Sequence, residues 1–116
     1  MRASGLTIEM PVSTLHVEPR VLHLCEVATL RERFDIVLVL MKAYDTRWAA
    51  ELIRPYLTED GIVAGLQNGM STDAIAAAVG PERTMGTVIE ISSTMYDPGR
   101  VIRHIGPDRS WFAVGS

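Results

Sequence analysis

Two residues, Lys42 and Asn68, combine a side chain suited to binding a polar ligand with a position close to the end of an apolar run. Lys42 directly follows Ile36–Met41, and its ammonium group could attract a phosphate or a carboxylate. Asn68 stands beside Gly69, where the backbone can approach a ligand closely and the amide offers a donor and an acceptor. Spacing alone favours a lysine that merely ends a strand in solvent, and an ordinary Asn-Gly turn is at least as frequent.

A third polar segment begins at Glu90, which interrupts the apolar stretch Val88–Ile91. A buried glutamate there could act as an acid or a base with a raised pKa, whereas a carboxylate exposed at a sheet edge is the more frequent outcome. Ser92 and Ser93 follow and complete this polar segment.

Other side chains that often carry chemistry lack the spacing for it. His16, His23 and His104 have no metal-ligand spacing with one another or with Cys25, so we predict no metal site. Cys25 is expected to be a small buried side chain. The sequence has no serine-hydrolase elbow and no phosphate-binding loop of the nucleoside-triphosphate type. It also has no Gly-x-Gly-x-x-Gly, and therefore no glycine turn to seat a pyrophosphate on a helix N-terminus.

The run Ile36–Met41 begins the elements that would position these residues. Its unbroken aliphatic character predicts a strand buried on both faces. Asp45 or Thr46 can cap a following helix, and Pro55 is expected to distort the last turn of that helix. The apolar face of the helix would comprise Trp48, Ala49, Leu52, Ile53, Tyr56 and Leu57.

Two further strands, Gly61–Leu66 and Thr84–Ile91, flank a second helix capped by Ser71. That helix would have Ile75, Ala78 and Val79 on its apolar side and Gly80-Pro81 as its stop. The alternation of strands and helices predicts an open α/β sheet, mostly parallel, with antiparallel additions near the C-terminus. Ligands bind such sheets outside the carboxyl ends of the strands, which is where the candidate residues stand.

The remaining sequence is less regular. Leu6–Glu9 and Thr14–Val17 predict a small antiparallel pair, and Val27–Arg33 is a weak helical candidate. Asp97-Pro98-Gly99 predicts a turn, and Trp111–Val114 a closing strand.

Composition bounds the class of protein. The 116 residues amount to one domain, expected over residues 1–116, and 47% of them are hydrophobic, which is too many for a disordered chain. The net charge of −3, with scattered basic side chains, gives no footprint for nucleic acid or for a lipid surface. The first residues lack a signal peptide's apolar stretch, and a single cysteine cannot form an internal disulfide, so a cytoplasmic location is expected.

Three blocks of the sequence resemble the cofactor domain of ketopantoate reductases (2-dehydropantoate 2-reductases). They are residues 34–46, residues 66–70, and residues 85–87 followed by 99–106, in the order and spacing of that family, with similarity from about Gly5 to Gly115. The resemblance implies a partial Rossmann-type sheet and an NADPH-dependent reduction of 2-dehydropantoate to D-pantoate. It also implies that Lys42, Asn68 and Ser92 bind the cofactor and that Asn68 binds the substrate as well.

The resemblance also has departures. In the family a glycine motif and a first strand–helix–strand unit precede this region, and the general acid is a lysine of a later helical domain. We therefore assign no catalytic residue here, and expect a partial domain that is inactive alone and binds NADPH weakly or not at all. Alternatives are a non-catalytic binding or assembly module, or part of a related reductase acting on another 2-oxo or 3-oxo acid. A sheet without its first strands would leave an open edge and favour self-association.

Overall fold

A computed structural model describes residues 1–115, which form two compact units. One unit comprises residues 1–29 and 90–111, and the other comprises residues 30–89 together with the segment from Phe112 onward. The single domain expected over residues 1–116 stays a prediction. No helix within residues 1–115 is both long and apolar enough to cross a membrane.

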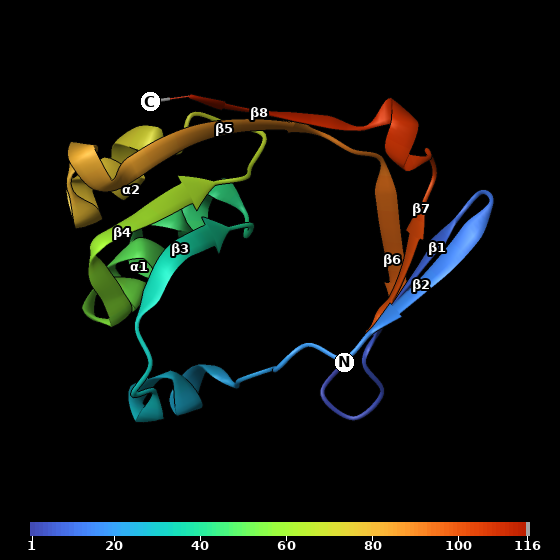
Figure 1. Cartoon of the computed structure of the whole chain (residues 1–116), viewed down its shortest axis with the longest axis horizontal. Helices are drawn as coiled ribbons and strands as arrows, with labels where there is room; N and C mark the ends of the chain where they lie inside the picture. The colour runs from blue at the N-terminus through green and yellow to red at the C-terminus, as the bar shows by residue number, and fades with distance from the viewer. Residues whose placement is uncertain (116) are drawn as a thin grey trace. The chain divides into compact units, whose positions relative to one another are not determined.

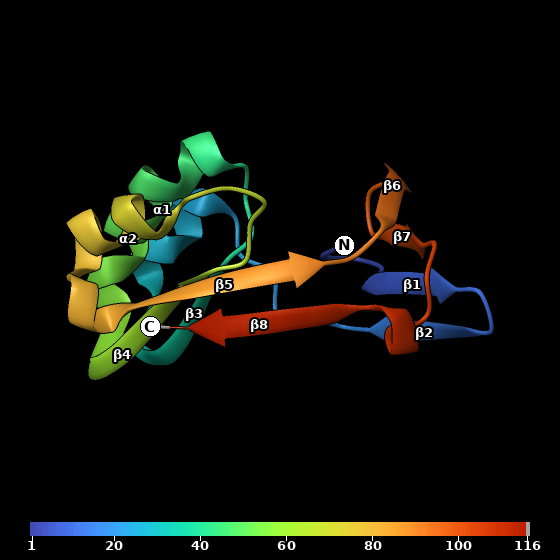
Figure 2. The same ribbon diagram turned by 90° about the horizontal axis from the view of Figure 1, so that it is seen from above.

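A four-stranded sheet, β3-β4-β5-β8 in spatial order, carries the elements nearest to the candidate residues. Its strands are β3 (Phe34–Val39), β4 (Leu57–Gly65), β5 (Thr84–Glu90) and β8 (Trp111–Gly115). β3, β4 and β5 are parallel, whereas β8 runs opposite to β5 (Figure 2). The open α/β sheet, its parallel centre and its antiparallel closing strand were therefore predicted correctly.

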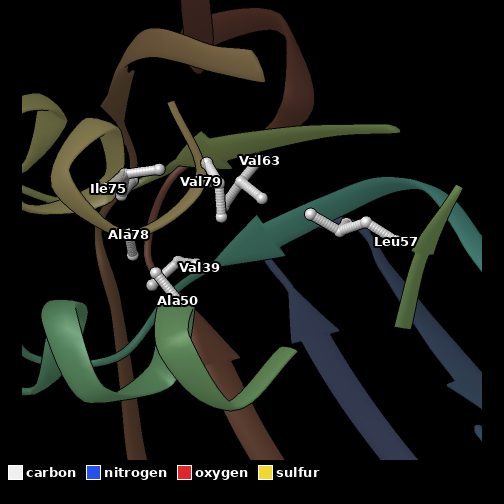
Figure 3. Close-up of a cluster of buried hydrophobic side chains, with 7 residues drawn as sticks. All are labelled: Val39, Ala50, Leu57, Val63, Ile75, Ala78 and Val79. Atoms are coloured by element: carbon white, nitrogen blue, oxygen red, sulfur yellow. The ribbon is translucent and has the colours of Figure 1, made fainter. Parts of the chain in front are cut away.

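Two helices, α1 (Thr46–Ile53) and α2 (Thr72–Val79), lie on the same side of this sheet (Figure 2). Their small and branched side chains meet the strands in a core of seven buried residues (Figure 3), namely Val39, Ala50, Leu57, Val63, Ile75, Ala78 and Val79. The apolar side predicted for the second helix, with Ile75 at its centre, is confirmed.

The expected burial of β3 on both faces is wrong. Val39 is buried beneath the helices, but Ile36 and Leu38 point to the opposite face and are 68% and 52% exposed. Successive side chains of a strand point to opposite faces, and both helices of this unit cover the same one. The aliphatic run therefore indicates that both faces of β3 are apolar, but it does not indicate that other elements cover both faces.

The first helix ends earlier than its apolar pattern predicts. Pro55 lies in a 3₁₀ turn, Arg54–Tyr56, and β4 starts at Leu57, four residues before the expected Gly61. Proline has no backbone N–H to continue the helical hydrogen bonds, so the chain turns into the strand there. Leu57 still reaches the core, as the first residue of β4.

The caps of both helices stand where they were predicted, but without the expected side-chain bonds. Asp45 precedes α1, and its carboxylate accepts a hydrogen bond from the Trp48 indole at 2.7 Å. Ser71 precedes α2 with no side-chain cap hydrogen bond, and Gly80 ends that helix with a positive φ of 96°.

The other unit contains a second sheet, β2-β1-β7-β6, which the sequence did not predict as such (Figure 1). Its strands are β1 (Leu6–Met10), β2 (Ser13–Val17), β6 (Ser93–Asp97) and β7 (Arg100–Arg103). β1 and β2 form the predicted antiparallel pair, and β6 and β7 are joined by the predicted turn, in which Gly99 has φ 87°. β1 and β7 pair in parallel, which unites the two hairpins.

The helix expected over Val27–Arg33 is wrong. A 3₁₀ turn, Leu24–Thr29, takes its place, and no regular element follows before β3. Further 3₁₀ turns occupy Ala43–Asp45, Pro81–Arg83 and Pro107–Arg109.

An ion pair between β1 and β7 gives a testable pH effect. The Arg100 guanidinium donates to both carboxylate oxygens of Glu9, at 2.7 and 3.1 Å, and this hydrogen bonding lowers the pKa of Glu9 below its usual value. The contribution of the pair to stability is therefore present above the ordinary glutamate pKa and is lost as the pH falls through the lowered one. In the Arg100→Gln variant, an NMR titration of the Glu9 carboxyl is expected to return its pKa toward the usual value. An unchanged titration would contradict the pairing.

Candidate functional site

The carboxyl ends of β3 and β4 bring Lys42 and Asn68 into neighbouring loops. Val39 pairs with Gly65 at the end of the two strands, and the Leu66 N–H donates to the Val39 carbonyl at 2.9 Å. Each candidate lies three residues beyond the last residue of its strand. The next residues, Ala43 and Gly69, are close enough that a Cβ on Gly69 would stand 3.7 Å from that of Ala43.

Lys42 presents its ammonium group to solvent. The residue is exposed and extended, with φ −61° and ψ 144°, and its carbonyl accepts the Asp45 N–H at 2.9 Å. Within residues 1–115 the ammonium group has no hydrogen-bond or ion-pair partner. It is available to an anionic ligand.

Asn68 is exposed in the tight loop between β4 and α2. Backbone bonds shape this loop: the Gly69 N–H donates to the Gln67 carbonyl at 3.1 Å, and the Ser71 N–H to the Gly69 carbonyl at 3.0 Å. The side-chain amide of Asn68 makes no hydrogen bond inside the described part of the chain. Both its donor and its acceptor are therefore available beside Lys42.

A buried polar contact beneath the two loops was not predicted from the sequence. The Thr46 hydroxyl donates to the Gln67 side-chain carbonyl at 3.0 Å, and the Gln67 amide nitrogen donates to the Met41 carbonyl. Thr46 is completely buried and Gln67 is 8% exposed. In the sequence, Thr46 stood out only as an alternative helix cap and Gln67 only as part of a motif.

An open cleft of about 710 Å³ lies beside this site, against α2, β5 and β8. Gly69, Thr72, Asp73 and Val88 are among the residues that line it, whereas Lys42 and Asn68 do not. Neither candidate residue therefore forms part of the cleft wall.

Ser92 belongs to the other unit. It is exposed between β5 and β6, and its carbonyl accepts the His104 N–H at 2.9 Å. The predicted contact of Ser92 with a cofactor stays a prediction, as do those of Lys42 and Asn68.

Glu90 is exposed and accepts a hydrogen bond from the Trp111 indole at 2.5 Å, which agrees with a surface carboxylate. The expectation that Cys25 is buried is wrong: it is exposed on the 3₁₀ turn Leu24–Thr29, where its sulfur lies 3.1 Å from Nδ1 of His23. A short surface turn has no layer above it to cover a side chain.

Two histidines, one in β2 and one just after β7, form hydrogen bonds with threonines on neighbouring strands. His16 meets Thr7 at 2.9 Å, and His104 meets Thr94 at 2.8 Å. These contacts link β2 with β1, and the segment after β7 with β6.

Parallel strands with polar loops at their carboxyl ends and helices on one face define an α/β protein with a Rossmann-like sheet. A sequence profile described as ketopantoate reductase PanE/ApbA matches residues 1–116. The chain belongs to this family. A search among curated proteins found no match.

Solved structures agree with this assignment. A 2-dehydropantoate 2-reductase from Geobacter metallireducens is 26% identical over the whole chain, with a TM-score of 0.79. A PanE/ApbA family ketopantoate reductase from Ralstonia eutropha is 27% identical over 88% of it, with a TM-score of 0.73. D-mandelate dehydrogenase, solved with NADH and anilino(oxo)acetate, shares the fold over 97% of it, at 18% identity and a TM-score of 0.79. The chain spans 37%, 33% and 35% of the lengths of these three proteins.

Proposed function

We propose that this chain supplies Lys42 and Asn68 to the nicotinamide cofactor site of a cytoplasmic reductase. The cofactor would be NADPH, and the reaction the reduction of 2-dehydropantoate to D-pantoate. One observation carries the proposal: an ammonium and an amide, both without a side-chain partner among residues 1–115, stand on adjacent loops at the carboxyl ends of parallel strands. In sheets of this kind that edge is where ligands bind.

The side chains present suit such a cofactor chemically. The Lys42 ammonium can neutralise a phosphate oxygen, and the Asn68 amide can both donate to and accept from a ribose hydroxyl. When bound, the nicotinamide supplies the hydride, and the protein supplies binding, orientation and electrostatics.

Asn68 would also bind the substrate, because its amide has capacity for more than one partner. We assign no general acid to this chain. The complete reaction is proposed for a protein in which the chain spans about a third of the length, as in its solved relatives.

Lys42 is the sole lysine of the sequence, which permits a direct test. In ¹⁵N-labelled protein, reductive ¹³C-dimethylation labels this residue and the N-terminus, and NADPH is then titrated while the ¹³C-methyl and ¹⁵N-amide NMR signals are followed. We expect Lys42 and the Asn68 side-chain amide to shift together at high NADPH concentration. Lys42→Ala should weaken binding about tenfold, the effect of losing one hydrogen bond to a charged group.

Arg54→Ala is the matched control, since it removes an exposed cation elsewhere in the same unit. This variant should bind NADPH as the wild type does. If neither Lys42 nor Asn68 responds to NADPH, or if Arg54→Ala weakens binding equally, the proposed site is wrong.

A second candidate function, assembly with another copy of the chain, is favoured by the uncovered face of β3. Among the strands of residues 1–115, β3 lies at the edge of its sheet, and Ile36 and Leu38 are exposed beside that edge. Antiparallel pairing of two β3 edges about Val37 would set Ile36 of one copy opposite Leu38 of the other. All four apolar side chains would then share one face, so we propose a weak homodimer through this edge.

Sedimentation across a range of concentrations tests this assembly. The apparent mass is expected to rise with concentration in the wild type and to stay that of a monomer in Leu38→Lys, which places a charge opposite the apolar Ile36 of the other copy. Val12→Lys is the control, because Val12 is 91% exposed in the turn between β1 and β2. A wild-type chain that stays monomeric throughout would refute the edge pairing.

A further inference from the structure

The side chain of Gln67 joins the two loops that carry Lys42 and Asn68. Its carbonyl accepts the Thr46 hydroxyl at 3.0 Å, and its amide nitrogen donates to the Met41 carbonyl. One side chain thus uses a donor and an acceptor at once, in opposite directions.

The position of these bonds along the chain gives them their significance. Met41 directly precedes Lys42, and Gln67 directly precedes Asn68. Thr46 is the first residue of α1, which the Lys42 loop leads into. The bonds of Gln67 therefore act on backbone that adjoins both candidate residues.

The strand ladder cannot hold the loops by itself. The pairing of β3 with β4 ends at Val39 and Gly65, and the Leu66 N–H makes the next backbone bond, to the Val39 carbonyl. Beyond that bond the two segments are linked through the Gln67 side chain. Its burial shields the hydrogen bonds from water, and a buried amide loses more when one partner is removed than an exposed one.

We propose that Gln67 is a positioning residue, which holds the Lys42 and Asn68 loops at the spacing that the ligand requires. This inference rests on the proposed function for its purpose, although the clamping itself is independent of any ligand. Gln67 touches neither cofactor nor substrate, and it acts through the backbone of its neighbours.

Hydrogen exchange measured without any ligand tests the clamping. In Gln67→Met, a variant of similar shape that loses both bonds, the hydrogen-bonded backbone amides of Asp45, Leu66 and Gly69 in the two loops are expected to exchange about tenfold faster. The amide of Val63, in the core, should keep its protection. Unchanged exchange in the loops would overturn the proposal, and so would an equal acceleration at Val63, since that would reveal a purely global effect.

Two threonines provide a matched pair of variants. Thr46→Val removes the donor to Gln67, whereas Thr58→Val removes the hydroxyl that donates to Asp35 at 3.0 Å, another bond between β4 and β3. Thr58 lies near the amino-terminal end of β4, away from the candidate loops. We expect loop exchange to accelerate in Thr46→Val and to stay at the wild-type rate in Thr58→Val. The reverse order would contradict the proposal.

Gln67→Glu offers a rescue that depends on pH. A protonated carboxyl can donate to the Met41 carbonyl and accept from Thr46, whereas the ionised form has no donor. Loop protection factors in this variant should therefore be closer to those of the wild type near about pH 5 than near about pH 7.5. A purely structural loss would show no such recovery on acidification.

The NADPH titration separates this inference from the proposed function. If the wild-type chain binds NADPH, Gln67→Met should weaken the response of Lys42 and Asn68 while Thr58→Val leaves it unchanged; equal binding in all three would overturn the positioning role. If the wild-type chain gives no response, the proposed cofactor site fails, and the exchange experiment still decides whether Gln67 clamps the loops.

Discussion

Replacing Ile75 by alanine is expected to lower the free energy of unfolding by about 2–5 kcal/mol. Ile75 is completely buried on α2, within the cluster that also contains Val39 and Val63 (Figure 3). The truncation removes apolar contacts and leaves a cavity that the surrounding backbone can close only in part. Against a total of about 5–15 kcal/mol for a typical domain, this is a large share.

Denaturant titrations followed by fluorescence would measure the effect. Trp48 lies on α1, in the same unit as Ile75, and a Trp111→Phe background removes the signal of the other tryptophan. Ile75→Val should lower the free energy of unfolding by about 0.5–1.5 kcal/mol, because it removes fewer apolar contacts than Ile75→Ala. Met70→Ala, at a side chain that is 96% exposed, should change stability by less than about 0.5 kcal/mol. Equal losses in Ile75→Ala and Met70→Ala would contradict the assignment of the core.

The order of strands and helices around the site follows from local sequence patterns. Aliphatic runs, a proline and a glycine stop are enough to place β3, α2 and β5, because each signal acts on the backbone within a few residues. The start of β4 was missed because Leu57 fits the spacing of a helix as well as that of a strand. The helix ends just before Pro55, so Leu57 belongs to the strand.

Burial depends on the elements that pack above a residue, and local patterns do not record it. Ile36 and Leu38 belong to an aliphatic run but are exposed, because α1 and α2 cover the other face. Cysteine is a residue type that is usually buried, but Cys25 lies on a surface turn. The sheet formed by β1 and β7 pairs residues that are about ninety positions apart, a contact that no local signal could indicate.

The candidate site divides in the same way. Lys42 and Asn68 could be placed together from sequence, because the carboxyl ends of adjacent parallel strands share one edge. The bond between Thr46 and Gln67 spans 21 positions and depends on how α1 begins above the end of β4. Residues that would meet a ligand are therefore accessible to sequence reasoning, whereas those that hold them in place required the structure.

Gly65→Ala is expected to destabilise the protein by about 1–3 kcal/mol, the usual cost of overpacking a core. A Cβ at position 65 would lie 2.6 Å from the Ser71 hydroxyl oxygen and 2.9 Å from Cδ1 of Ile75. Both distances are shorter than van der Waals contact, and both neighbours are themselves buried, so either these side chains change rotamer inside the core or the start of α2 moves away from β4. A movement of α2 would also displace the loop of Asn68, which leads into this helix.

Gly115→Ala is the matched control, because a Cβ on Gly115 in β8 would meet no atom within 4 Å. This variant should keep the wild-type stability to within about 0.5 kcal/mol, and its loop amides should exchange as in the wild type. In Gly65→Ala, by contrast, the hydrogen-bonded amides of Leu66 and Gly69 should lose protection along with the fall in stability. A stable Gly65→Ala protein with unchanged exchange would show that β4 and α2 are not packed as closely as these distances require.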